Sequence, residues 1–220
     1  MARPRNPLLS RERIVAAAVA LVDAEGLAAL STRRLAAELG VSGPSLYNHF
    51  ATKDALLDAV IDHVLGEVDL SMWSEPTRAG SARDWQAPLL EWARSYRGAL
   101  VAHPQLVPVL AQGPGRRANA LRIADAVFGG LVDAGWSKGE ATRIGALMRY
   151  FVFGSALGSF AAGFVDDEQV YAGDYPHLGE AHLLAERQRQ VDEGAFETGL
   201  TALVDGLVLR YARQGRRSAS

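Results

Sequence analysis

The chain of 220 residues contains no cysteine, and its most apolar stretch is short. The absence of cysteine excludes disulfides, thiolate nucleophiles and cysteine-ligated metal sites together, and it is consistent with a reducing compartment. The uncharged part of the apolar stretch, Tyr150 to Val165, is shorter than the ~20 residues that a membrane span needs. Near the N-terminus, Arg11, Glu12 and Arg13 interrupt any apolar run of signal-peptide type. The sequence therefore predicts a cytoplasmic protein without a membrane span or a secretion signal.

An excess of positive charge is also missing. The chain has 23 Lys and Arg residues against 25 Asp and Glu residues, so its formal net charge is −2. Any DNA binding must therefore come from a local arrangement of basic residues and not from bulk attraction to phosphate. The remaining composition, with 49% hydrophobic and 22% charged residues, is that of a folded globular protein.

Apolar residues recur at spacings of three and four along most of the chain, and strand-like alternation is almost absent. Ser10 and Thr52 precede two helical patterns as candidate N-caps, and Ser31 or Thr32 precedes another. Ser137 with Glu140 forms a capping-box pattern. The sequence predicts an all-α fold with helices over residues 10–24, 31–39, 44–50, 53–68, 85–102, 105–111, 117–134, 139–164, 180–191 and 194–213, and a loop over 71–83.

Two of these helices, 31–39 and 44–50, are separated only by the turn Gly40-Val41-Ser42. This length and pattern fit a helix-turn-helix, whose second helix lies in the major groove of DNA. On period and turn alone, a plain helical hairpin fits equally well.

The residues of this segment favour the helix-turn-helix. The stretch from Leu30 to Leu57, LSTRRLAAELGVSGPSLYNHFATKDALL, resembles the DNA-binding signature of the tetracycline-repressor (TetR) family, above all in Leu-Tyr-x-His-Phe-x-x-Lys. The resemblance implies a three-helix DNA-binding domain over residues 1–54 and a larger helical ligand-binding and dimerisation domain over 55–220. It further implies a homodimeric transcriptional regulator, a repressor that a small molecule releases from a near-palindromic operator. The alternative is an architectural DNA-binding protein without an effector.

The same resemblance assigns roles in DNA binding. Short side chains at the start of the recognition helix can approach base edges, phosphate contacts come from hydroxyl, imidazole and ammonium groups, and one arginine reaches a guanine. The residues at the start of the recognition helix are Gly43, Pro44 and Ser45. The phosphate contacts are assigned to Thr32, Tyr47, His49 and Lys53, and the guanine contact to Arg33. Asn48 is expected to contribute to operator choice. Tyr47 as a half-buried core residue, His49 packed on the fourth helix and Lys53 as a solvated cation are the alternatives. Four arginines, Arg3, Arg5, Arg11 and Arg13, suggest a basic N-terminal arm, although an ordinary disordered terminus explains them equally well.

In the second domain, small residues at a spacing of four allow close approach of another helix, and the last helix has a broad apolar face. The predicted dimer interface comprises Gly154, Gly158, Ala162, Leu200, Leu203 and Leu207. Packing within a single chain is the alternative. The predicted effector pocket is lined mainly by apolar and aromatic residues, which implies a largely apolar effector. Its candidates are Trp92, Tyr96, His103, Leu106, Leu110, Phe128, Met148 and Phe151, although such residues more often form core.

Catalytic and metal-binding patterns are not found. Gly154-Ser155 lacks the flanking glycines of a nucleophile elbow, and Gly113-Pro114-Gly115 lacks the strand and third glycine of a dinucleotide loop. His103, His177 and His182 have no recognisable ligand spacing. We therefore expect neither an enzyme nor a metal or other cofactor.

Overall fold

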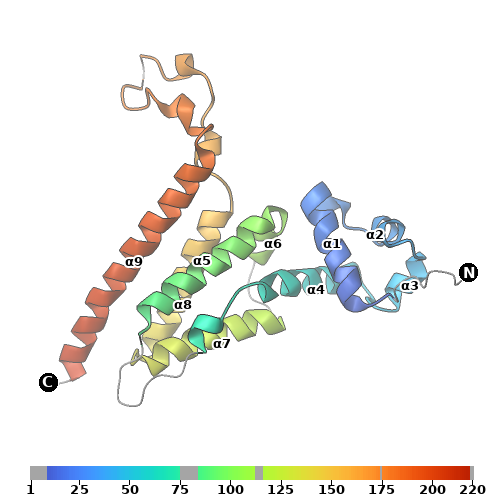
Figure 1. Cartoon of the computed structure of the whole chain (residues 1–220), viewed down its shortest axis with the longest axis horizontal. Coiled ribbons are helices and arrows are strands. Elements are labelled where there is room, and N and C mark those ends of the chain that lie inside the picture. Colours follow the sequence, from blue (N-terminus) through green and yellow to red (C-terminus); the bar gives the residue numbers. More distant parts are fainter. Residues whose placement is uncertain (1–8, 75–83, 112–115, 174, 219–220) are drawn as a thin grey trace, which may run out of the picture. The chain divides into compact units, whose positions relative to one another are not determined.

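The computed structural model describes residues 9–74, 84–111, 116–173 and 175–218, and among these residues it contains helices and no strand (Figure 1). The prediction of an all-α fold is confirmed. The α-helices are α1 (Arg11–Glu25), α2 (Thr32–Leu39), α3 (Gly43–Tyr47), α4 (Lys53–Gly66), α5 (Gln86–Ala102), α6 (Val107–Leu110), α7 (Ala118–Asp133), α8 (Lys138–Ala156) and α9 (Gln188–Ser218). Short 3-10 turns are η1 (Leu27–Ala29), η2 (Ser71–Trp73), η3 (Pro104–Leu106), η4 (Ala161–Gly163), η5 (Glu168–Val170) and η6 (Ala181–Leu184). No helix within the described ranges is both long and apolar enough to cross a membrane.

The chain divides into two compact units. The first comprises Met1–Val68 with Ala99–Ile123, and the second comprises Asp69–Gly98 with Ala124–Ser220. The first unit thus takes in all of α4 and a later segment in addition to the helix-turn-helix. Compactness does not by itself assign a function to a unit, so the functional division at residue 54 stays a prediction.

Side-chain caps start α1, α2 and α4 of the first unit. The hydroxyl of Ser10 accepts a hydrogen bond from the Arg13 amide (3.2 Å) and that of Thr52 from the Ala55 amide (3.0 Å). Ser31, one of the two candidates for α2, accepts from the Arg34 amide (3.2 Å). Each such cap satisfies an amide that the helix leaves unpaired and is worth about 1 kcal/mol. The predicted helix starts at these positions are confirmed.

The turn of the helix-turn-helix depends on a glycine. Gly40 has φ 65° and ψ 34°, the left-handed conformation, and its amide bonds back to Ala36 and Ala37 at the end of α2. Glycine adopts this conformation without a Cβ penalty, which lets the chain reverse directly into α3. Leu35, Leu46 and Phe50 are buried and hold these helices together, while Leu39 and Val41 are half-buried.

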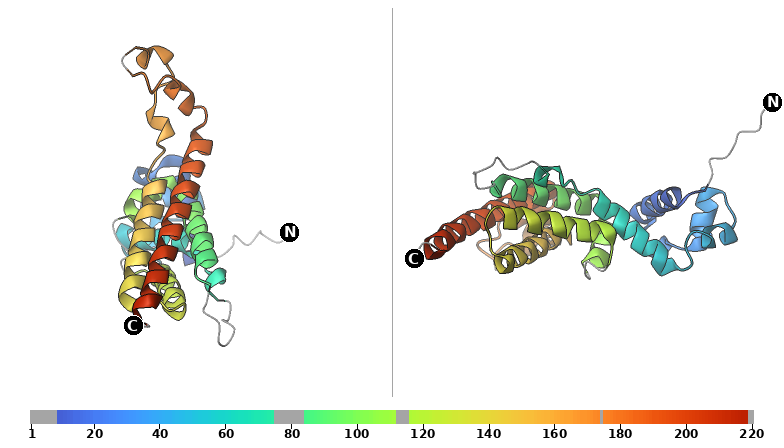
Figure 2. Two further views of the ribbon diagram at one scale, coloured as in Figure 1. Left: turned by 90° about the vertical axis from the view of Figure 1, so that its left-hand side faces the viewer. Right: turned by 90° about the horizontal axis from the view of Figure 1, so that it is seen from below.

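In the second unit, α8 and α9 run alongside each other (Figure 2). An aromatic cluster lies near one end of this pair: Trp136 packs edge-on against Trp85 (5.3 Å between ring centres) and 5.0 Å from Tyr211. The predicted cap of α8 is confirmed, because the Ser137 hydroxyl accepts from the Glu140 amide (3.3 Å). The Glu140 carboxylate pairs with Arg143 and Arg210.

The long helix predicted over 139–164 is wrong at its C-terminal end. Helix α8 stops at Ala156, and a new short turn, η4, follows. The hydroxyl of Ser159 accepts from the Ala162 amide in this turn (3.0 Å), a local bond that competes with continuation of the helix. Gly154, Gly158 and Ala162 therefore do not form a stripe on one helix.

Two other helix boundaries also differ from prediction. Helix α9 begins at Gln188 and continues through Gly194, where a helix start was predicted, and only the turn η6 precedes it. Helix α3 ends at Tyr47, three residues before the predicted end at Phe50.

Candidate functional sites

The predicted DNA-contacting residues lie at the ends of three neighbouring helices (Figure 1). Thr32 and Arg33 open α2, and Lys53 opens α4. Helix α3 supplies Gly43, Pro44, Ser45 and Tyr47, its C-cap is Asn48, and His49 follows.

Tyr47 joins two of these helices on one surface. Its side chain is 54% exposed, and its hydroxyl lies 3.5 Å from the hydroxyl of Thr32. The neighbouring Leu46 and Phe50 fill the core instead, with exposures of 3% and 4%. The exposure of Tyr47 argues against the half-core alternative and leaves its hydroxyl accessible for a phosphate oxygen.

The two adjacent arginines of α2 differ in their partners. The Arg34 guanidinium pairs with Glu25 (2.5 Å) and with Glu38 (3.0 Å). These bonds raise the pKa of Arg34, and the bond from Arg34 lowers the pKa of Glu25. Arg33 is exposed, and no ion pair engages it among the described residues. Arg33 is therefore the arginine of α2 that is available for a base edge.

The basic arm needs correction. Arg11 and Arg13 belong to α1 and are not part of an arm, because Ser10 already caps the helix. Arg11 donates a hydrogen bond to the main-chain oxygen of His49 and lies over the ring of Phe50. Arg3 and Arg5 lie outside the described residues.

The predicted effector residues fall in different parts of the fold. Trp92 and Tyr96 of α5, Phe128 of α7 and Met148 and Phe151 of α8 belong to the second unit, whereas His103, Leu106 and Leu110 belong to the first. The structure brings Trp92 and Tyr96 together (5.7 Å between ring centres), and Tyr96 packs edge-on against Phe153 (5.5 Å). Phe151 instead stacks on Phe196 of α9 (5.3 Å), which fits a core role.

His103 makes contacts that sequence reasoning missed. Its Nδ1 lies 2.8 Å from the Asp23 carboxylate at the end of α1, and its Nε2 lies 3.1 Å from the Glu67 carboxylate just after α4. These partners are 80 and 36 positions away, so no local spacing could have revealed them. In this structure His103 ties α1 and α4 to the segment before α6, and its contact with an effector stays a prediction.

Two of the predicted dimer residues have little exposed surface, and the dimer interface stays a prediction. Leu200 and Leu207 are buried within a single chain (0% and 5% exposed), so they have almost no surface left for a partner. The large exposed apolar side chains of α8 are Leu147 and Tyr150, and Leu157 follows the helix. The signal for them was in the sequence, because Leu147, Tyr150, Gly154 and Leu157 are spaced by three and four residues.

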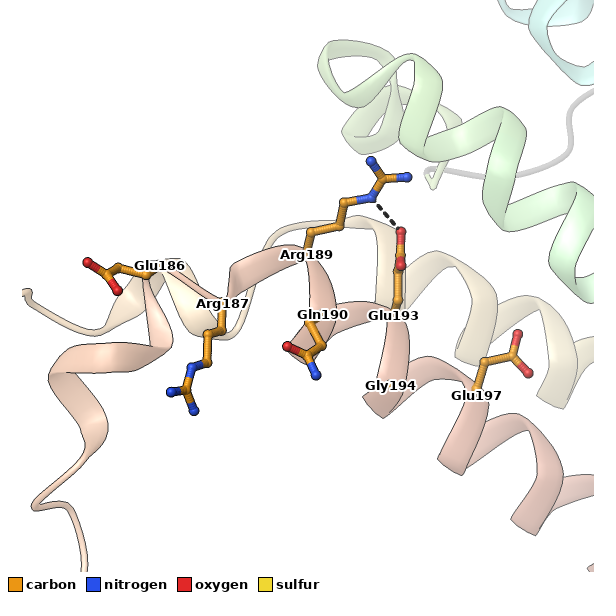
Figure 3. Close-up of a pocket in the computed structure, with 7 residues that line it drawn as sticks. All are labelled: Glu186, Arg187, Arg189, Gln190, Glu193, Gly194 and Glu197. Atoms are coloured by element: carbon orange, nitrogen blue, oxygen red, sulfur yellow. Dashed lines mark hydrogen bonds and ion pairs between the residues drawn. The ribbon is translucent and has the colours of Figure 1, made fainter.

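Figure 3 shows an open hollow beside the first turns of α9. Most of its lining residues carry charged or polar side chains, and they include the Arg189–Glu193 ion pair (2.8 Å). None of the predicted effector residues lies there; the lining residues are Glu186, Arg187, Arg189, Gln190, Glu193, Gly194 and Glu197. Across the described ranges, no three His, Asp or Glu side chains gather in a way that could hold a metal ion.

The burial of Tyr96 predicts that the protein loses stability at alkaline pH. Burial raises the pKa of its phenol from 10.0 to about 12, although the charge and hydrogen bond of Arg149 act in the opposite direction. Between these values the unfolded chain loses the proton first, so the free energy of unfolding should fall with rising pH by up to about 1.4 kcal/mol per unit. We expect the free energy of unfolding, measured with urea between pH 10 and 12, to fall less steeply with pH in Tyr96→Phe than in the wild type. Identical slopes would contradict this role of Tyr96.

Two short helices joined by a tight turn, one with exposed hydroxyl and amide groups and the other opening on an arginine without an ion pair in the described part of the chain, define a helix-turn-helix protein of the DNA-binding type. The family described as bacterial regulatory proteins, tetR family, matches residues 14–60, and the tetracyclin repressor-like C-terminal domain matches residues 79–211. The chain belongs to the tetR family of bacterial regulatory proteins, and the resemblance recognised in the sequence is confirmed.

Individual relatives agree with this assignment. An HTH-type transcriptional regulator of Saccharopolyspora erythraea is 34% identical over 87% of this chain and 75% of its own length. The class A tetracycline repressor from transposon 1721 of Escherichia coli is 34% identical over 92% of both chains. ActR of Streptomyces coelicolor, solved with (S)-DNPA, has a TM-score of 0.70 at 31% identity, covering 91% of this chain and 98% of its own. BioQ, solved with its double-stranded DNA operator, has a TM-score of 0.59 at 27% identity, with coverage of 91% and 98%.

Proposed function

We propose that this protein is a homodimeric repressor that binds a near-palindromic operator through α2 and α3 and releases it when a small molecule binds. The observations that carry the proposal are the hydroxyls of Thr32 and Tyr47, 3.5 Å apart, and the exposed Arg33 on the first turn of α2, which makes no ion pair among the described residues. A guanidinium can read guanine bidentately in the major groove, while hydroxyls anchor the phosphates. A protein with this role acts in the cytoplasm on double-stranded DNA and performs no catalysis.

Two of the solved relatives support the two halves of this proposal. BioQ was solved with a DNA operator and ActR with a small molecule, and both align with more than nine-tenths of this chain. For this protein we infer a largely apolar effector, because the buried candidates Trp92, Tyr96 and Met148 supply mostly hydrocarbon and aromatic surface.

Helix α4 offers a route for the signal within the first unit. Its Asp62 accepts from the amide of Asn119 (2.8 Å), and its Asp58 accepts from the side chain of Arg117 (2.7 Å). Beyond its C-terminus, Glu67 contacts His103. A ligand that shifts the segment 99–123 would therefore pull on α4, which leads directly into the helix-turn-helix. The coupling needs only a differential affinity for two conformers, commonly about 1–3 kcal/mol.

For the dimer we propose the exposed apolar surface of α8, made by Leu147, Tyr150, Gly154 and Leu157. These residues offer the uncovered area that Leu200 and Leu207 lack. A two-fold axis would place two recognition helices about one turn of DNA apart, which is why we expect a near-palindromic operator.

The decisive experiment is selection of bound fragments from a random duplex pool by the purified protein at near-physiological salt. An enriched palindrome would support operator binding and provide the probe for an effector screen. Binding without enrichment, with a steep dependence on salt, would favour an architectural DNA-binding protein. Operator binding that no compound in a broad apolar panel relieves would argue against the effector half of the proposal.

A further inference from the structure

The recognition helix α3 is too short to hold its own C-terminal end. It has five residues, and the amides of His49 and Phe50, just beyond it, both donate to the carbonyl of Leu46 (2.9 Å each). The last carbonyls of any α-helix have no partner inside the helix. In a helix of five residues, most of the carbonyls are of this kind. The position of α3 therefore depends on contacts with other parts of the chain.

Arg11 supplies such a group from the start of α1. Its Nη1 donates to the main-chain oxygen of His49, 38 positions later in the chain. Its guanidinium carbon also lies 4.0 Å from the centre of the Phe50 ring. Phe50 is only 4% exposed, so the ring is anchored in the core of the unit. The edge of the Arg11 guanidinium therefore donates a hydrogen bond just beyond α3, and its face stacks on the buried ring of Phe50.

We propose that Arg11 is a positioning residue for DNA reading: it fixes the C-terminal end of α3, and thereby the direction in which Tyr47 and Asn48 face the operator. This rests on the proposed function, because it assumes that α3 is the helix that reads DNA. Arg11 acts through His49 and Phe50 and does not itself contact the DNA.

Arginine suits this task better than lysine. Its planar guanidinium can stack on an aromatic face while donating hydrogen bonds in its own plane. An ammonium group can replace the hydrogen bond to His49 but not the stacking. Arg11→Lys should therefore rescue part of the function that Arg11→Met removes.

The first test needs no DNA. Hydrogen exchange is measured on the wild type, on Arg11→Met and on Arg122→Met, which removes an equal charge from an exposed site on α7. We expect the amides of His49 and Phe50 to exchange about tenfold faster in Arg11→Met, with α1 and α4 unchanged, and at the wild-type rate in Arg122→Met. Equal exchange in the wild type and Arg11→Met would overturn the proposal, whether or not the protein selects an operator.

The second test measures the operator Kd of the same proteins and Arg11→Lys between 50 and 200 mM salt, concentrations at which phosphate contacts dominate the slope. We expect Arg11→Met to bind about tenfold more weakly, Arg11→Lys to lie between it and the wild type, and the salt slope to stay the same. A slope reduced by about one contact per protomer would identify Arg11 as a direct phosphate ligand and overturn the positioning role. If the wild type itself selects no operator, the proposed function fails, and the exchange result still decides whether Arg11 holds α3.

Discussion

Arg33→Ala should weaken operator binding at least about thirtyfold while leaving the fold intact. Arg33 is exposed on the first turn of α2 and makes no ion pair among the described residues, so its truncation removes no internal contact seen there. A bidentate contact from arginine to guanine contributes about 1–3 kcal/mol, and a dimer loses it at both half-sites. The measurement is a titration of the selected operator and of a random duplex of equal length at one stated salt concentration.

The neighbouring arginine is the matched control. Arg34 is occupied by Glu25 and Glu38, and exposed ion pairs of this kind contribute about 0–1 kcal/mol. We therefore expect Arg34→Ala to change the operator Kd by less than about threefold. Binding to the random duplex should change little in either variant, because phosphate contacts carry most of that affinity. Equal losses in the two variants would contradict a specific role for Arg33.

Gly130→Ala should cost about 3 kcal/mol of stability, the largest structural effect that we expect from a single added methyl group. A Cβ at position 130 of α7 would lie 2.1 Å from Cε3 and 2.4 Å from Cζ3 of Trp73. The Trp73 ring is 6% exposed, so it has no free space into which it can turn. Overpacking in such a site typically costs about 1–3 kcal/mol because side chains and backbone must shift.

The same substitution at the adjacent glycine, Gly129, should raise the stability of the protein instead of lowering it. Among the described residues, no atom outside the helix's own backbone lies within 4 Å of a Cβ built at Gly129, and the residue is within the same helix. Gly129→Ala should therefore stabilise the protein by about 0.5–1 kcal/mol, since alanine loses less backbone entropy on folding. Denaturant unfolding of both variants, monitored by circular dichroism, compares the midpoints at equal slope. A Gly130→Ala variant as stable as Gly129→Ala would show that Trp73 does not pack on α7.

The features predicted correctly from the sequence are those that local interactions determine. Ser10, Thr52 and Ser137 start their helices because each hydroxyl bonds an amide three residues later, a contact contained in one turn. Gly40 ends α2 for an equally local reason, its left-handed conformation. The all-α fold and the helix-turn-helix follow from these signals together with the spacing of apolar residues.

Competing local signals limited the prediction of helix ends. The apolar pattern beyond Ala156 has helical spacing, but the Ser159 hydroxyl accepts from the Ala162 amide within a new turn there. Gly194 suggested a helix start, yet α9 passes through it without a break. The outcome at such positions depends on packing against other helices, which can override a weak local preference.

By itself, the sequence determined the class of protein, the helix-turn-helix segment and the start of its second helix, because these depend on contacts within a few residues. The tertiary structure decided which side chains remain available to contact DNA or a second protomer. Glu25 pairs with Arg34 while Arg33 makes no ion pair within the described ranges, Arg11 reaches His49 across 38 positions, and His103 reaches Asp23 across 80. It also buried Leu200 and Leu207 while leaving Leu147 and Tyr150 exposed. Availability and burial depend on where distant segments pass one another, and no spacing along the chain encodes that arrangement directly.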